Sequence, residues 1–68
     1  MNDIRHGTVV AFDAEVGLGE IATVDGVRYP FHCVEIADGT RIIEVGTPVV
    51  FRLQCKLGRY EAAALARA

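Results

Sequence analysis

The sequence predicts an all-β domain of five short strands, arranged as a barrel or a sandwich. The first observation is the regular spacing of turn-forming residues: glycine, joined by aspartate or proline at some turns, recurs about every ten residues. Short strands separated by turn signals at such intervals are typical of small all-β folds. The second observation is length. A 68-residue chain buries only about 60% of its unfolded surface, which favours a compact, closed architecture.

Each expected strand lies between two of these turn signals. The five strands are expected at residues 8–12, 18–23, 28–33, 49–55 and 60–65. Asp25-Gly26 separates the second from the third and indicates a tight hairpin turn. In the fourth, apolar residues at 49, 51, 53 and 55 alternate with 50, 52 and 54, which predicts one inward and one outward face.

The last segment, 61–68, is ambiguous by propensity. It is rich in alanine, leucine, glutamate and arginine, which are good helix formers. Eight residues are too few to hold a helix without tertiary support, whereas a fifth strand would cover an exposed sheet edge. We therefore expect a strand.

Three residues in or directly before the expected strands need special positions. Gly17 and Gly19 predict a close approach of neighbouring strands or a bulge, because a glycine has no side chain to accommodate. Pro30 has no N–H to donate, so we expect its strand to lie at a sheet edge or to be bulged there.

Length and composition predict one domain spanning 1–68, without membrane association. No apolar run approaches the roughly 20 residues of a membrane span. The amino-terminal residues lack the apolar core of a secretory signal, so we expect a cytoplasmic protein. Nine acidic and seven basic side chains give a net charge of −2, so there is no overall basic excess to attract nucleic acid.

Cysteine and histidine positions predict neither a metal site nor a catalytic one. Cys33 and Cys55 are far apart in sequence, and we expect both to be reduced and partly buried. With His6 and His32 they form no ligand spacing that metals use. The chain has no serine and no convincing acid-base pair, so we expect no enzyme and no cofactor.

Two segments stand out as motifs: residues 7–21 read GTVVAFDAEVGLGEI, and residues 29–32 read YPFH. In sequence and spacing they resemble the two ribonucleoprotein-type motifs of cold-shock domains. The resemblance extends from Gly7 to Leu65. It implies an OB-fold, which is a five-stranded antiparallel Greek-key barrel, and binding of single-stranded RNA or DNA.

The departures from the family pattern predict weak or altered binding. Ala11 stands in place of a tryptophan, and most of the phenylalanines that stack on bases are replaced, as are two lysines. Each stacked base contributes about 1–3 kcal/mol, so several such losses are costly. Glu20 adds a carboxylate at the centre of the face that would meet phosphates.

Six residues remain as candidate nucleic-acid contacts. Phe12, Leu18 and His32 occupy motif positions, while the last turn and its flanks contribute Lys56, Arg59 and Tyr60. Rings would stack on bases and cations would meet phosphates. There are also ordinary interpretations: Phe12 as a partly buried strand aromatic, His32 as a solvated histidine, and Lys56 and Arg59 as surface charges.

The alternative hypothesis is a protein-interaction module that has lost nucleic-acid binding. Val10, Leu18 and Glu20 would then form an apolar surface with an acidic centre. Such exposed apolar patches mark partner surfaces, so a protein partner or a weak homodimer is expected in that case.

Overall fold

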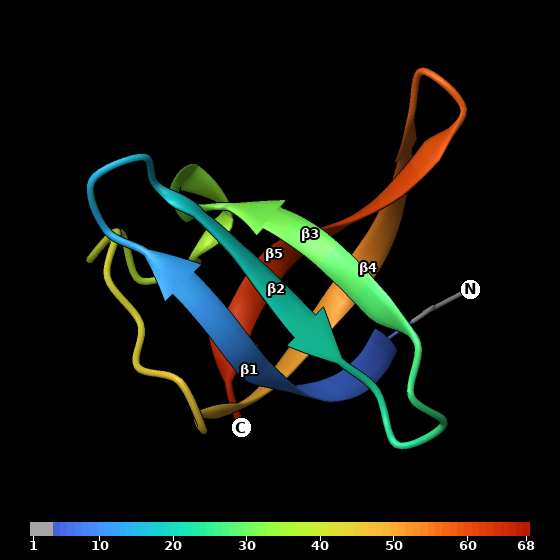
Figure 1. The fold of residues 1–68 in the computed structure, drawn as a ribbon, viewed down its shortest axis with the longest axis horizontal. Coiled ribbons are helices and arrows are strands. Elements are labelled where there is room, and N and C mark those ends of the chain that lie inside the picture. Colours follow the sequence, from blue (N-terminus) through green and yellow to red (C-terminus); the bar gives the residue numbers. More distant parts are fainter. Residues whose placement is uncertain (1–3) are drawn as a thin grey trace.

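Five strands form a single antiparallel sheet that curls on itself (Figure 1). The structure is a computed structural model and describes residues 4–68. The elements are β1 (Ile4–Asp13), β2 (Leu18–Ala22), β3 (Arg28–His32), the short 3-10 helix η1 (Cys33–Glu35), β4 (Pro48–Lys56) and β5 (Arg59–Arg67). The all-β prediction and the strand at the carboxyl end are confirmed. The domain expected over 1–68 includes residues 1–3, which lie outside the described residues.

Strand β1 is shared between two ladders. Its first part, from Ile4 to Thr8, pairs with β4, and its second part, from Thr8 to Asp13, pairs with β2. Gly7 lies where the two ladders meet, and a Cβ there would lie 2.5 Å from Cγ2 of Ile21. Only glycine therefore lets β1 cross so close to the core. A bulge between Val9 and Ala11 adds to the bend.

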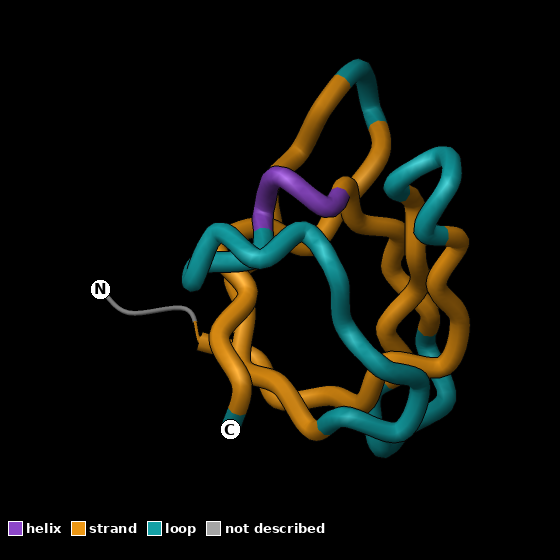
Figure 2. Tube along the Cα trace, turned by 90° about the vertical axis from the view of Figure 1, so that its left-hand side faces the viewer, coloured by secondary structure: helices purple, strands orange, loops and turns teal. Residues whose placement is uncertain are grey.

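The sheet order β3-β2-β1-β4-β5 places β3 and β5 at its two ends, and the curl brings these ends together (Figure 2). No ladder joins them within residues 4–68. Instead the segment around η1 contacts β5: the Ala37 N–H donates to the Leu65 carbonyl at 2.6 Å. The Ala64 N–H donates to Oε1 of Glu35 at 3.1 Å. The result is the predicted five-stranded, Greek-key OB-fold. Its sheet stays open between β3 and β5, and the segment around η1 bridges the two strands there.

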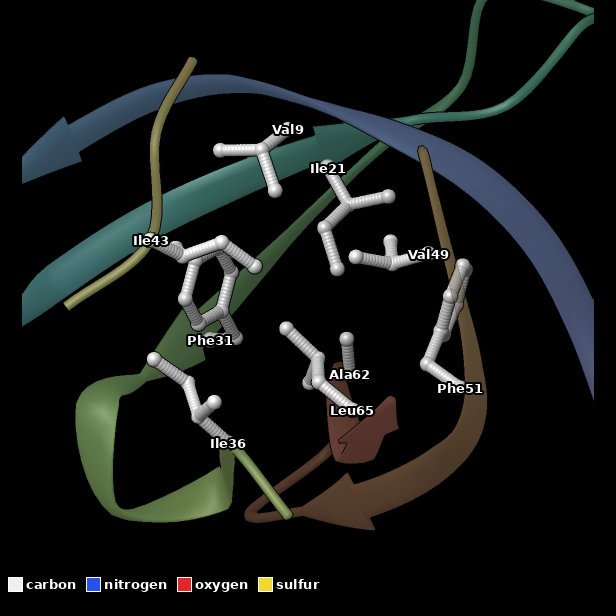
Figure 3. Close-up of a cluster of buried hydrophobic side chains, with 9 residues drawn as sticks. All are labelled: Val9, Ile21, Phe31, Ile36, Ile43, Val49, Phe51, Ala62 and Leu65. Carbon is white, nitrogen blue, oxygen red and sulfur yellow. The ribbon is translucent and has the colours of Figure 1, made fainter. Parts of the chain in front are cut away.

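Nine apolar side chains fill the barrel (Figure 3). They are Val9, Ile21, Phe31, Ile36, Ile43, Val49, Phe51, Ala62 and Leu65. The alternation expected in β4 holds for Val49 and Phe51, and Leu53 is half-buried. Cys55 corrects one expectation, because it is exposed where β4 runs beyond the core, whereas Cys33 is partly buried as expected. Both are free thiols.

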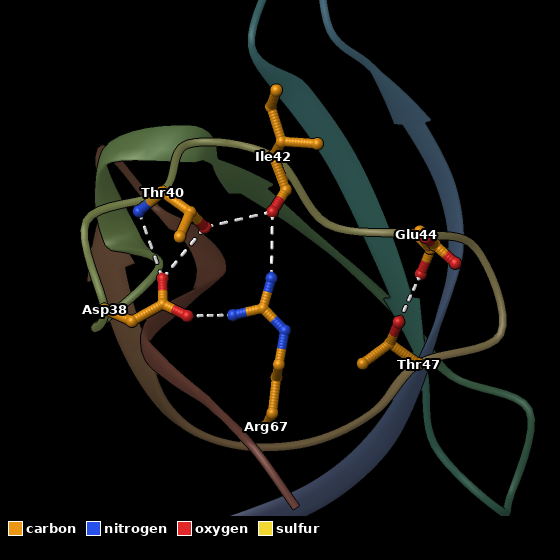
Figure 4. Close-up of polar contacts among 6 residues, drawn as sticks. All are labelled: Asp38, Thr40, Ile42, Glu44, Thr47 and Arg67. Atoms are coloured by element: carbon orange, nitrogen blue, oxygen red, sulfur yellow. Dashed lines mark hydrogen bonds and ion pairs between the residues drawn. The ribbon is translucent and has the colours of Figure 1, made fainter.

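The long connection from η1 to β4 is held against β5 by polar contacts (Figure 4). Arg67 pairs with the Asp38 carboxylate, and its Nη2 donates to the Ile42 carbonyl at 2.9 Å. The backbone N–H and hydroxyl of Thr40 donate to Oδ1 of Asp38 at 3.1 and 2.9 Å. These bonds, the backbone one first, hold the pKa of Asp38 below its ordinary value. They tie the loop that bears Ile43 over the open end of the core.

Candidate nucleic-acid interface

The outer face of β1, β2 and β3 is the surface that the motif resemblance assigns to bases. Residues opposite one another in the ladders point to the same side, so the register identifies its members. They are Thr8, Ala11, Asp13, Leu18, Glu20, Ala22, Arg28, Pro30 and His32. His32 provides the one aromatic ring in this set. The face therefore lacks a platform of several aromatic side chains.

Phe12 lies on the opposite, core-facing side of β1. Its cross-strand neighbour is Gly19, which in turn lies opposite Phe31. Because Gly19 has no side chain, the Phe12 and Phe31 rings stack across it, 5.9 Å apart and 8° from parallel. This is the close approach predicted at Gly19. The placement agrees with Phe12 as a half-buried strand aromatic, and its contact with a base stays a prediction.

Leu18 and His32 form the apolar and aromatic part of the outer face. They are directly opposite in the β2–β3 ladder, and both are exposed. Strand β3 is an edge strand, as Pro30 predicted, so nothing in the ladder covers the far side of His32. The two side chains together offer a small surface on which one base could lie.

The end of the β4–β5 hairpin projects beyond the barrel (Figure 1), and we call residues 54–61 the arm. Its turn residues Leu57 and Gly58 both have positive φ, 51° and 78°, as in the tight turns that suit hairpins. Lys56 lies directly opposite Arg59, on one side of the arm. Tyr60 pairs with Cys55, one position along each strand, so its ring lies on the other side.

Glu61 joins the arm to the outer face of β3. Its Oε1 lies 3.9 Å from Nε2 of His32 and 3.9 Å from Nζ of Lys56. Two predicted contacts from distant parts of the sequence are thereby brought together. We call Leu18, His32, Glu61, Lys56 and Arg59 the outer strip, which crosses from β2 over β3 to the arm.

Four of the six predicted site residues lie on the outer strip, and Phe12 and Tyr60 lie on the other side of their strands. Sequence reasoning missed Glu61 and Arg28. Nη1 of Arg28 is 3.3 Å from Oε1 of Glu20, so the carboxylate expected to repel phosphates is paired with a cation. The hairpin at Asp25-Gly26 was the available signal, because it brings β3 back beside β2 with Arg28 near Glu20.

Two further classes of feature are missing from the described part of the chain. No group of three or more histidine, cysteine, aspartate or glutamate side chains there could hold a metal ion. Among residues 4–68 no helix is long and apolar enough to cross a membrane.

Comparison with known proteins supports the fold. No protein-family model matches the chain, and no curated protein does either. Among solved structures, the chain is similar to one described as Drosophila Unr CSD456, at a TM-score of 0.80 and 24% sequence identity. The match covers 96% of this chain and 26% of that one, so this chain spans about a quarter of its length. The fold is that of a cold-shock domain.

Proposed function

We propose that the protein binds single-stranded RNA or DNA weakly, through the outer strip. Cold-shock domains are among the modules that recognise single strands by stacking and backbone contacts. Because one fold can serve several functions, the proposal rests on the side chains. Leu18 and His32 would receive a base, and Lys56 and Arg59, which share one side of the arm, would contact phosphates.

The observation that carries the proposal is the position of Lys56 directly opposite Arg59 in the β4–β5 ladder. Two cations directly opposite in a hairpin repel each other and destabilise it. No hydrogen bond or ion pair to the Arg59 side chain is found among residues 4–68. A polyanion passing over this side of the arm would offset that repulsion, which supports a role in binding phosphates.

Weak binding follows from the composition of the strip. One imidazole replaces a cluster of aromatic rings, each of which is worth about 1–3 kcal/mol per stacked base. Two carboxylates also lie on the outer side of the strands, Glu20 beside Arg28 and Glu61 beside Lys56, and both would repel a phosphate. Phe12 and Tyr60 stay predicted contacts, and absence of catalysis and cytoplasmic location stay expectations from the sequence.

The test is fluorescence anisotropy with labelled oligothymidine and the corresponding oligouridine at several salt concentrations. We expect both to bind, with affinity that falls as salt rises. For single strands the logarithmic salt slope is about 0.7 per phosphate contact, so Lys56→Ala combined with Arg59→Ala should lower it by about 1.4. Arg41→Ala, an exposed cation on the connection to β4, is the control and should change the slope little. Unchanged binding by the double variant would contradict the proposal.

A protein-interaction function is the second candidate, and exposed apolar residues favour it. Val16 and Val34 are each 64% exposed and flank Gly17 and Cys33, whose backbones are hydrogen-bonded at 2.8 Å. Leu18 lies next to them at 42% exposure. Sedimentation experiments would test this function by measuring self-association of the protein. Self-association that Val16→Thr combined with Val34→Thr weakens, together with no binding of oligonucleotides, would favour this function instead.

A further inference from the structure

The carboxylate of Glu61 lies where a lysine and a histidine side chain from different strands converge. We infer that it occupies the position of a backbone phosphate, and that His32 and Lys56 form a phosphate subsite connecting the outer face of β3 to the arm. The inference rests on the proposed function and deepens it. It gives Glu61, already a member of the outer strip, the role of an internal competitor of the nucleic acid.

The geometry makes Glu61 the fixed member of the cluster. Its side chain is 20% exposed, against 52% for His32 and 44% for Lys56. A single oxygen, Oε1, lies 3.9 Å from both partners. The carboxylate is thus anchored by packing, while the two donors extend towards it from separate strands. A phosphate oxygen in the same place would be within reach of both.

The contacts of Glu61 are loose enough to be replaced. At 3.9 Å both contacts exceed hydrogen-bond length, and the partners of Glu61 are half-exposed, so water can enter between them. Exposed pairs of this kind are weak. A phosphate that approached closely enough for a charge-assisted hydrogen bond would hold Lys56 more firmly than Glu61 does. The carboxylate left beside it would then repel the phosphate, which keeps affinity low.

The experiment compares the affinity of oligothymidine for Glu61→Gln, for wild type and for Glu44→Gln. Glutamine keeps the size of the side chain and removes its charge. Glu44 is exposed on the connection to β4, so its variant removes the same charge away from the strip. We expect Glu61→Gln to bind about two- to five-fold more tightly than wild type, the range that exposed ion pairs span. Because Lys56 already contacts a phosphate in wild type, the salt slope should change by less than the value of about 0.7 that one whole contact contributes.

A variant cycle separates a local effect from a change in net charge. In a Lys56→Ala background, the gain from Glu61→Gln should be smaller than in the wild-type background, because Lys56 is no longer there to be freed and only His32 remains beside the carboxylate. The gain from Glu44→Gln should be the same in both backgrounds. If wild type binds and Glu61→Gln binds equally or more weakly, the inference is wrong and the proposed function stands. If wild type and Glu61→Gln both fail to bind any oligonucleotide, the proposed function fails and the inference falls with it.

Discussion

Gly19→Ala should destabilise the domain strongly, although it adds one methyl group. The new Cβ would lie 2.5 Å from Cζ of Phe31 and 2.8 Å from the Ala11 carbonyl oxygen. Ordinary contacts are about 3.5–4.0 Å, so the ring would have to move by about 1 Å. Phe31 is fully buried and stacked on Phe12, and the Ala11 backbone belongs to the β1–β2 ladder. Overpacking of this kind costs about 1–3 kcal/mol, and with both neighbours constrained we expect the upper end.

Far-UV circular dichroism during urea and thermal unfolding measures this cost. For a domain of this size about 1 kcal/mol corresponds to about 4–8 °C in Tm. Phe31→Leu should partly rescue Gly19→Ala, so that the double variant is more stable than the summed effects by at least about 1 kcal/mol. Gly26→Ala is the control. Its Cβ meets nothing within 4 Å and its φ of +85° imposes only backbone strain, so its effect should add to that of Phe31→Leu. If the effects of Gly19→Ala and Phe31→Leu on the free energy of unfolding simply add, the steric reasoning is refuted.

Three further predictions concern stability. Leu57→Asn should raise stability by about 1 kcal/mol, measured as urea midpoint, because asparagine tolerates the positive φ of 51° better than leucine does. Leu65→Ala should cost about 2–5 kcal/mol by the same assay, since the side chain is completely buried; a smaller loss would mean that the core collapses around it. The pKa of Asp38 is lowered from 3.8, chiefly by the Thr40 backbone bond. Its contribution to stability is therefore present above about pH 4 and lost as the pH falls through the lowered folded value. Asp38→Asn should remove this part of the acid dependence in unfolding experiments from pH 2 to 6.

Much of the fold was predictable because local and global signals agree. Turn residues at regular spacing located all five strands, and the need to cover an edge outweighed helix propensity at residues 61–68. Pro30 and Gly19 occupy the edge and the close approach that their chemistry predicted. The prediction for Cys55 was wrong because the alternation of apolar residues in β4 continues past the end of the core. A pattern along one strand does not tell where the side chains that cover it end.

The candidate site was less predictable, since it depends on which residues meet across strands. Alternation does not tell which side of β1 faces the core, so the sequence left Phe12 open between a contact and a packing residue. The ion pair of Glu20 with Arg28 and the cluster around Glu61 need the register of β2–β3 and the approach of β5 to β3. These distances come from tertiary structure, and no propensity encodes them.

The most direct test of the outer strip is an NMR titration of isotopically labelled protein with oligothymidine, at low and at physiological salt. Our account predicts that chemical-shift changes follow the strip, from Leu18 and His32 to Lys56 and Arg59, and fade as salt is added. The connection between η1 and β4 should show little change. No shifts at millimolar oligonucleotide, or shifts confined to that connection, would contradict the account.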